Sequence, residues 1–80
     1  MNVFFARTRS GVDKFIEIKK SAVDVELWVN GGVDLRGFDL HAYSITEFGV
    51  KFDIKNADEL DAALGTIEDH YQECVVWVEA

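Results

Sequence analysis

Proline is absent from this chain of 80 residues, cysteine occurs once, and no apolar run exceeds the five residues of "CVVWV" at 74–78. The lack of proline- or serine-rich tracts argues against linkers and disordered tails, so we expect one compact domain over residues 1–80. A run of five apolar residues cannot span a bilayer. Because the single Cys74 cannot form an internal disulfide, a reducing compartment is indicated, and we expect a cytoplasmic location.

Basic residues are scarce after position 20. Residues 1–20 hold five Lys or Arg against two Asp or Glu, whereas residues 21–80 hold three against thirteen, and the net charge is −7. Nucleic-acid binding depends on Lys and Arg that displace counterions from phosphates, so this balance argues against direct contact with DNA or RNA. The partner that the charge favours is a basic protein surface.

Signatures of catalysis and of metal or cofactor binding are also missing. A nucleophilic cysteine needs a histidine to activate it, but His41 and His70 lie in segments that do not place them beside Cys74. Two histidines fall short of the ligands that a zinc site requires. No strand, glycine-rich loop and helix follow one another as a phosphate-binding loop would need. The sequence therefore predicts a protein that is not an enzyme and that uses no metal or cofactor.

Short segments that alternate apolar and polar residues make up most of the chain. The candidate strands in the first half are "NVFFARTR" (2–9), "DKFIEIKK" (13–20) and "VDVELWVN" (23–30). The "NGG" that follows, residues 30–32, predicts a hairpin turn, from which "VDLRGFDLHAYSI" returns as a further strand. The last strand, "ECVVWVE" (73–79), is apolar on both faces and is expected in the middle of the sheet.

One amphipathic helix is predicted within "NADELDAALGTIEDHYQE", residues 56–73. Asn56 and Glu59 have the spacing of a capping pair, which makes Ala57 the first helical residue. The apolar arc, at 100° per residue, consists of Leu60, Ala63, Leu64, Ile67 and Tyr71. Gly65 leaves two alternatives, an unbroken helix or a break with a restart at Thr66.

These elements predict an α+β fold. In it a four- to five-stranded, mostly antiparallel sheet carries one acidic amphipathic helix, residues 57–71, packed on one face.

Seven residues are candidates for binding a partner. The first four lie on the outer arc of the helix and are Asp58, Asp61, Glu68 and Asp69. No Lys lies at i±4 to pair with them, and the last two are in the final turn, where the helix dipole disfavours negative charge. The arc is therefore either a binding surface or a solvated helix face.

The other three candidates are Asp24, Glu26 and Trp28, on the strand face opposite Val23, Val25, Leu27 and Val29. If that face is open, Trp28 is an exposed aromatic ringed by acids, which is typical of a hot spot for Lys- and Arg-rich proteins. The alternative is that Trp28 packs over the sheet with Phe38 or Tyr43.

The chain resembles the small phage-encoded inhibitors, and among them the anti-CRISPR proteins. The resemblance covers its whole character: 80 residues, acidic, proline-free, without a catalytic signature, and with an expected sheet followed by the acidic "NADELDAALGTIEDHYQE" helix. It implies inhibition by direct binding to a CRISPR effector, in some members by DNA mimicry, in which carboxylates take the place of target-DNA phosphates. No motif aligns, so no binding residue of the family can be assigned to a position here.

The sequence therefore predicts a non-enzymatic protein inhibitor that blocks access of target DNA to a basic, nucleic-acid-binding effector. Two alternatives remain, an immunity or antitoxin-like protein that neutralises a basic toxin nuclease, and a small structural or interaction domain.

The chain has six phenylalanines, a surplus for one small core, and the apolar "CVVWV" adds to this surplus. The surplus of phenylalanine and the apolar "CVVWV" segment predict a homodimer, with an edge strand paired across a two-fold axis.

Overall fold

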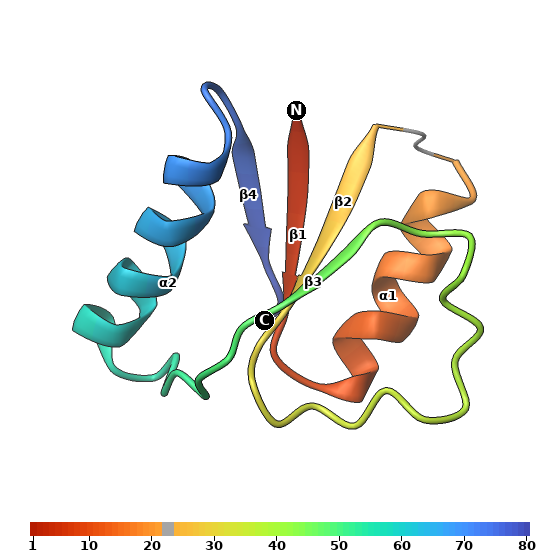
Figure 1. Ribbon diagram of the computed structural model, residues 1–80, viewed down its shortest axis with the longest axis horizontal. Coiled ribbons are helices and arrows are strands. Elements are labelled where there is room, and N and C mark those ends of the chain that lie inside the picture. Colours follow the sequence, from red (N-terminus) through yellow and green to blue (C-terminus); the bar gives the residue numbers. More distant parts are fainter. Residues whose placement is uncertain (22–23) are drawn as a thin grey trace.

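The computed structural model describes residues 1–21 and 24–80 and contains four strands and two helices (Figure 1). In chain order they are β1 (Asn2–Ala6), α1 (Arg9–Lys19), β2 (Val25–Val29), β3 (Ile45–Glu47), α2 (Ala57–His70) and β4 (Val75–Val78).

The four strands form one sheet in the order β3-β2-β1-β4, and every pair is parallel. The prediction of a mostly antiparallel sheet is therefore wrong. Parallel neighbours cannot be joined by a tight turn and need a long crossover. Here α1 connects β1 to β2, a long loop connects β2 to β3, and α2 carries the chain from one edge of the sheet to the other (Figure 1).

Helix α1 occupies most of the segment that was predicted as a second strand. Thr8 caps it by accepting a hydrogen bond from the backbone N–H of Gly11. Val12 and Phe15 are buried and lie three residues apart, which is a helical spacing. The alternation within "FIEIKK" resembles a strand as closely as a helix, and the cap upstream decides between them.

The "NGG" segment does not form a hairpin. Gly32 has the positive φ of 84° that such a turn requires, but the chain continues as a loop to β3, parallel to β2. Asn30 holds the loop by binding a later segment: its side chain donates to Phe52 O (2.9 Å) and accepts from Phe52 N (2.9 Å). The amide of Asn30 thus pairs with Phe52 as a neighbouring strand would.

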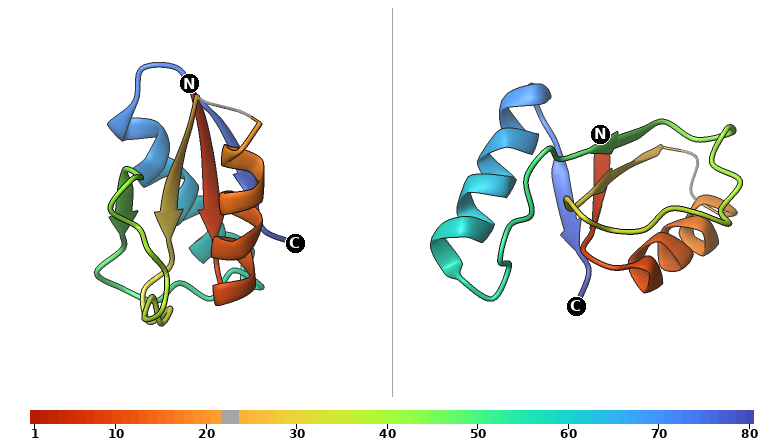
Figure 2. Two further views of the ribbon diagram at one scale, coloured as in Figure 1. Left: turned by 90° about the vertical axis from the view of Figure 1, so that its right-hand side faces the viewer. Right: turned by 60° about the horizontal axis from the view of Figure 1, so that its bottom comes forward.

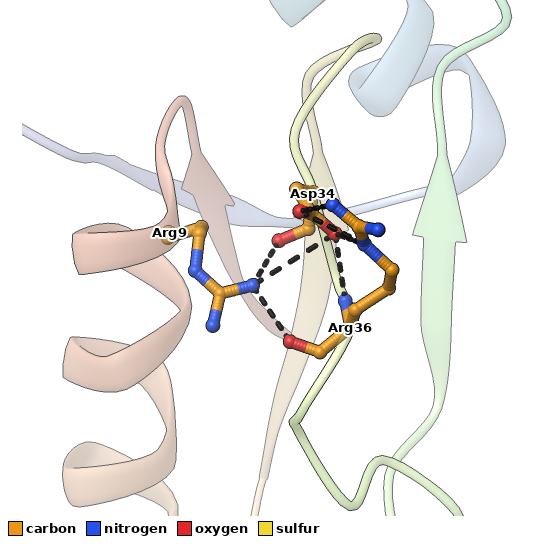
Figure 3. A network of polar contacts seen from close by, with 3 residues as sticks. All are labelled: Arg9, Asp34 and Arg36. Carbon is orange, nitrogen blue, oxygen red and sulfur yellow. Dashed lines mark hydrogen bonds and ion pairs between the residues drawn. The ribbon is translucent and has the colours of Figure 1, made fainter.

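Arg9, the first residue of α1, fastens the same loop from the other side (Figure 3). Its Nη1 donates to the carbonyl oxygens of Asp34 and Arg36, each at 2.7 Å, and its guanidinium lies 4.6 Å from the centre of the Phe38 ring. The Asp34 carboxylate accepts from the Arg36 side chain, which lowers the pKa of Asp34. A loop without a helix of its own is ordered by these contacts.

Helix α2 confirms the predicted helix. It begins at Ala57, the Asn56 side chain accepts from the N–H groups of Asp58 and Glu59, and the helix continues through Gly65 without a break. The apolar arc packs on the sheet as expected, with Ala63 and Ile67 fully buried.

The sheet is covered on both faces, not on one (Figure 2). On the α1 side, Val25, Leu27 and Val29 share a face as the alternation predicted. The other buried residues of that core are Phe4, Ala6, Val12 and Phe15. Val23, assigned to the same face, lies outside the described residues. On the α2 side the core consists of Val3, Phe5, Trp28, Phe48, Ala63 and Ile67.

Strand β4 lies at an edge of the sheet, so the central position predicted for it is wrong. Among the strands that the structure describes, only β1 pairs with it, and Val75 and Trp77 are more than half exposed. Among the described helices, none is long and apolar enough to cross a membrane.

Candidate functional site: the acidic face of α2

The four candidate carboxylates of α2 lie together on its solvent side. Asp58, Asp61, Glu68 and Asp69 are all exposed, as the helical period predicted. No residue in the described part of the chain forms an ion pair with any of them. Asp58 lies in the first turn, where its negative charge is stabilised by the helix dipole. Glu68 and Asp69 lie in the last turn, where the dipole destabilises a negative charge.

Glu26 on β2 is hydrogen-bonded to Tyr71, the residue that caps the C-terminal end of α2. The Tyr71 hydroxyl donates to Oε2 of Glu26 and accepts from Nε1 of Trp28 at 3.0 Å. Burial raises the pKa of Tyr71, and the hydrogen bond to Glu26 raises it further, because both favour the neutral phenol. The C-terminal end of α2 is thus tied to β2.

Trp28 is not the exposed hot spot that was one of its two predicted placements, because its side chain is only 4% exposed. The alternative, packing over the sheet, is right, but the partners differ. Phe38 and Tyr43 belong to the α1 face, and Trp28 lies on the α2 face against Phe48, with ring centres 5.2 Å apart. Trp28 supports the acidic face from beneath and does not form part of it.

Asp24 is exposed and lies just before β2, with Oδ2 at 4.0 Å from the amino group of Met1. The structure therefore links only part of the predicted set. Four carboxylates share α2, Glu26 is bound to the residue that caps this helix, Trp28 is buried below, and Asp24 contacts the chain terminus instead.

Cys74 and His70 make packing contacts on the α2 side of the sheet. Cys74 is half-buried just before β4 and packs on the α2 core. The His70 ring lies edge to face against the rings of Trp28 and Tyr71. Among the described residues, no three of the His, Cys, Asp and Glu side chains are grouped so as to hold a metal ion.

Glu79 was not singled out from the sequence, yet it is one of two buried polar residues of the described chain, 6% exposed. Its Oε1 accepts from the backbone N–H groups of Arg7 (2.8 Å) and Thr8 (2.9 Å), and its Oε2 accepts from Oγ1 of Thr8 (2.5 Å). The carboxylate thus occupies the positive end of α1, beside the carboxyl ends of β1 and β4. The only signal in the sequence was an acid directly after an apolar strand.

That position is where the strand order changes direction, since β2 and β3 are added on one side of β1 and β4 on the other. In open parallel sheets this switch point is the usual place for a bound phosphate, which the N-terminus of the following helix accepts. Here the Glu79 carboxylate occupies the switch point. The switch point is therefore a structural tie between β4 and α1.

Comparison of the chain with protein-family models, with curated proteins and with solved structures gave no match.

Removal of the Tyr71 hydroxyl tests the link between α2 and β2. We expect Tyr71→Phe to lower the free energy of unfolding by about 1–3 kcal/mol at pH 7, because Glu26 and the indole N–H of Trp28 both lose a partner. Since the fold raises the pKa of Tyr71 above the ordinary 10.0, the parent should lose stability as the pH rises above that value. Tyr71→Phe should lose less stability over the same pH range.

Urea unfolding followed by tryptophan fluorescence between pH 7 and 11 measures both effects. Tyr43→Phe, which removes a hydroxyl on the α1 face, is the matched control. Equal alkaline losses in the parent and in Tyr71→Phe would contradict the assignment.

Proposed function

We propose that this protein is a non-enzymatic inhibitor that binds a basic protein surface through the acidic face of α2. The observation that carries the proposal is the set of four exposed carboxylates, Asp58, Asp61, Glu68 and Asp69, that have no ion-pair partner within the described chain. Unpaired like charges on one helix repel one another and cost stability. A cationic partner would remove that cost.

The size of the face suits a surface that binds nucleic acid. Asp58 to Asp69 spans about 16 Å of helix at 1.5 Å per residue, which is the scale of a few phosphate steps along a strand. A protein that presents carboxylates at this spacing would compete with DNA for a channel lined by Lys and Arg. Association would be fast and would weaken steeply with salt.

Two kinds of basic, nucleic-acid-binding partner fit this mechanism. A CRISPR effector subunit, whose access to target DNA would be blocked, is the one suggested by the resemblance to anti-CRISPR proteins. A toxin nuclease is the other, and the same face would then act as that of an immunity protein. In either case the site of action is the cytoplasm, that of the host cell if the gene is carried by a phage.

Neutralisation of the face should separate binding from stability. We expect the triple variant Asp61→Asn, Glu68→Gln, Asp69→Asn to fold with unchanged or slightly higher stability, because mutual repulsion is removed. Its affinity for the partner should fall at low salt, and the dependence of affinity on ionic strength should become flatter.

The matched control is Asp13→Asn, Asp39→Asn, Glu47→Gln, three exposed acids off α2 that change the net charge equally. The partner is first isolated by pull-down from the native host at low and high salt, and the affinities are then measured by titration calorimetry across a salt series. Equal losses of affinity in both triple variants would show that net charge alone, and not the α2 face, determines binding, which would contradict the proposal. Full affinity in the α2 variant would refute the proposal.

A further inference from the structure

Most basic side chains that lack a partner gather in one place. Of the eight Lys and Arg residues, four have partners within the described part of the chain, namely Arg9, Lys19, Lys20 and Arg36. Three of the remaining four, Arg7, Lys51 and Lys55, line a single pocket of about 360 Å³. The fourth, Lys14, is exposed on α1 and lies outside it.

The pocket lies at the carboxyl ends of parallel strands. Arg7 and Thr8 directly follow β1, Asn30 directly follows β2, and residues 51–55 form the wall that leads into α2. In Figure 1 the N-terminal ends of both helices point toward this same end of the sheet. The Glu79 carboxylate occupies the start of α1, and Asp58 and Glu59 lie in the first turn of α2, so the cationic side chains supply the positive charge of the pocket. Crevices outside the carboxyl ends of parallel strands are where such sheets bind ligands.

Arg7 carries the most specific sign of a missing ligand. Its Nε is buried and has no hydrogen-bond partner in the described structure, although its backbone N–H is bound to Glu79. A buried N–H without an acceptor is costly, and more so on a charged group. An arginine fork that offers Nε–H together with a terminal N–H matches two oxygens of a phosphate or carboxylate.

The remaining wall is rigid and partly apolar. Asn30 is 4% exposed and fixes the backbone of Phe52 by two hydrogen bonds, so the segment that carries Lys51 is held against β2. Phe52 and Ile54 contribute apolar surface. Asp53 is the one acid in the lining, and its Oδ1 accepts from the backbone N–H of Lys55. The lining side chains hold three cations and one carboxylate in a protein of net charge −7. Beside them, the carboxylates of Glu79 and Glu59 accept from backbone N–H groups of the lining residues.

We propose that this pocket binds the phosphate group of a small phosphorylated molecule, with Arg7 as the bidentate ligand and with Lys51 and Lys55 as the neutralising charges. The volume lies at the small end of the range of roughly 300–1,000 Å³ for ligand pockets, so it suits one phosphate with a modest organic group. The acidic surface elsewhere disfavours a nucleic-acid chain. The site is independent of the α2 face, and failure of one proposal leaves the other standing.

The three arginines of the chain allow a direct test by NMR. Their Nε–H signals are followed during titration of the full chain with inorganic phosphate, adenosine 5′-monophosphate and glucose 6-phosphate, against potassium chloride at equal ionic strength. We expect the Arg7 signal, assigned with Arg7→Met, to shift and saturate, and those of Arg9 and Arg36 to stay in place. Absence of a saturable Arg7 shift beyond that in chloride would overturn the proposal.

Single variants then show how much each side chain contributes to phosphate affinity. Arg7→Lys keeps the charge and loses the fork, so we expect affinity for the best phosphate compound to fall about ten- to a hundredfold, as for the loss of hydrogen bonds between charged groups. Lys51→Gln and Lys55→Gln should each weaken it, whereas Lys14→Gln, the matched control, should not. Thermal melts establish that each variant is folded.

Three results would count against the proposal. An equal loss in Lys14→Gln would show a general charge effect. Acetate or citrate that binds as tightly as phosphate would show a carboxylate site. A single-stranded oligonucleotide that binds more tightly than the mononucleotide would show a nucleic-acid surface.

Discussion

Replacement of Glu79 by alanine should lower the free energy of unfolding by about 3–5 kcal/mol, since hydrogen bonds to a charged group contribute more than neutral ones and the freed donors remain partly buried. Its carboxylate accepts from two backbone N–H groups and one hydroxyl at the start of α1. For a domain whose total stability is about 5–15 kcal/mol, such a loss approaches global unfolding.

Glu79→Gln gives the graded comparison. The amide keeps one acceptor oxygen but loses the charge and presents an NH₂ group to Thr8, so we expect an intermediate loss. Glu73→Ala, an exposed acid close in sequence, is the control and should change stability by less than about 0.5 kcal/mol. Urea unfolding of the three variants measures the loss of stability in each and so ranks them. A Glu79→Ala variant as stable as Glu73→Ala would refute the structural tie.

Substitution of Gly11 by alanine should be the second most damaging change. An added Cβ would overlap Oε1 of Glu79, and would lie 2.6 Å from its Cδ and 2.9 Å from Cβ of Ala6. We expect a net loss of at least about 2 kcal/mol, because this overlap outweighs the gain of about 1 kcal/mol that alanine brings to a helix. The control is Gly65→Ala in α2, where nothing lies within 4 Å of the added carbon. That variant should gain stability.

A double-mutant cycle shows whether the two positions act through each other. In the Glu79→Ala background, Gly11→Ala should cost less than in the parent, because the carboxylate it would displace is gone. The contact with Ala6 should keep part of the cost. Thermal and urea unfolding of the four proteins give the coupling. Strictly additive losses would mean that Glu79 does not lie against Gly11.

The sequence predicted α2 and its acidic arc correctly because the information is local. The cap at Asn56 and the apolar spacing both lie within the helix, so exposure of Asp61 and Glu68 follows from the period alone. For α1 the local evidence was divided, since "FIEIKK" fits either period, and Thr8 as a cap was overlooked. The parallel sheet was missed because the "NGG" segment suggests a hairpin when its neighbours are unknown.

Features that depend on contacts between distant segments could not be read from the sequence. The burial of Trp28 requires α2 to cover its face of the sheet, and no pattern around Trp28 says so. The role of Glu79 depends on a partner 71 residues away, at Thr8. The pocket of Arg7, Lys51 and Lys55 likewise combines the end of β1 with a segment that follows β3.

The position of β1 in the middle of the sheet determines the order in which the fold can assemble. Its partner β2 follows after one helix, so the β1-α1-β2 unit closes a short loop at low entropic cost. Its other partner, β4, is the last element of the chain and can dock only after the long intervening segment is in place. Until then one edge of β1 is unpaired, and Val3 and Phe5, fully buried in the finished protein, are exposed beside it. Any opening that releases β4 recreates this edge, which is a template for aggregation.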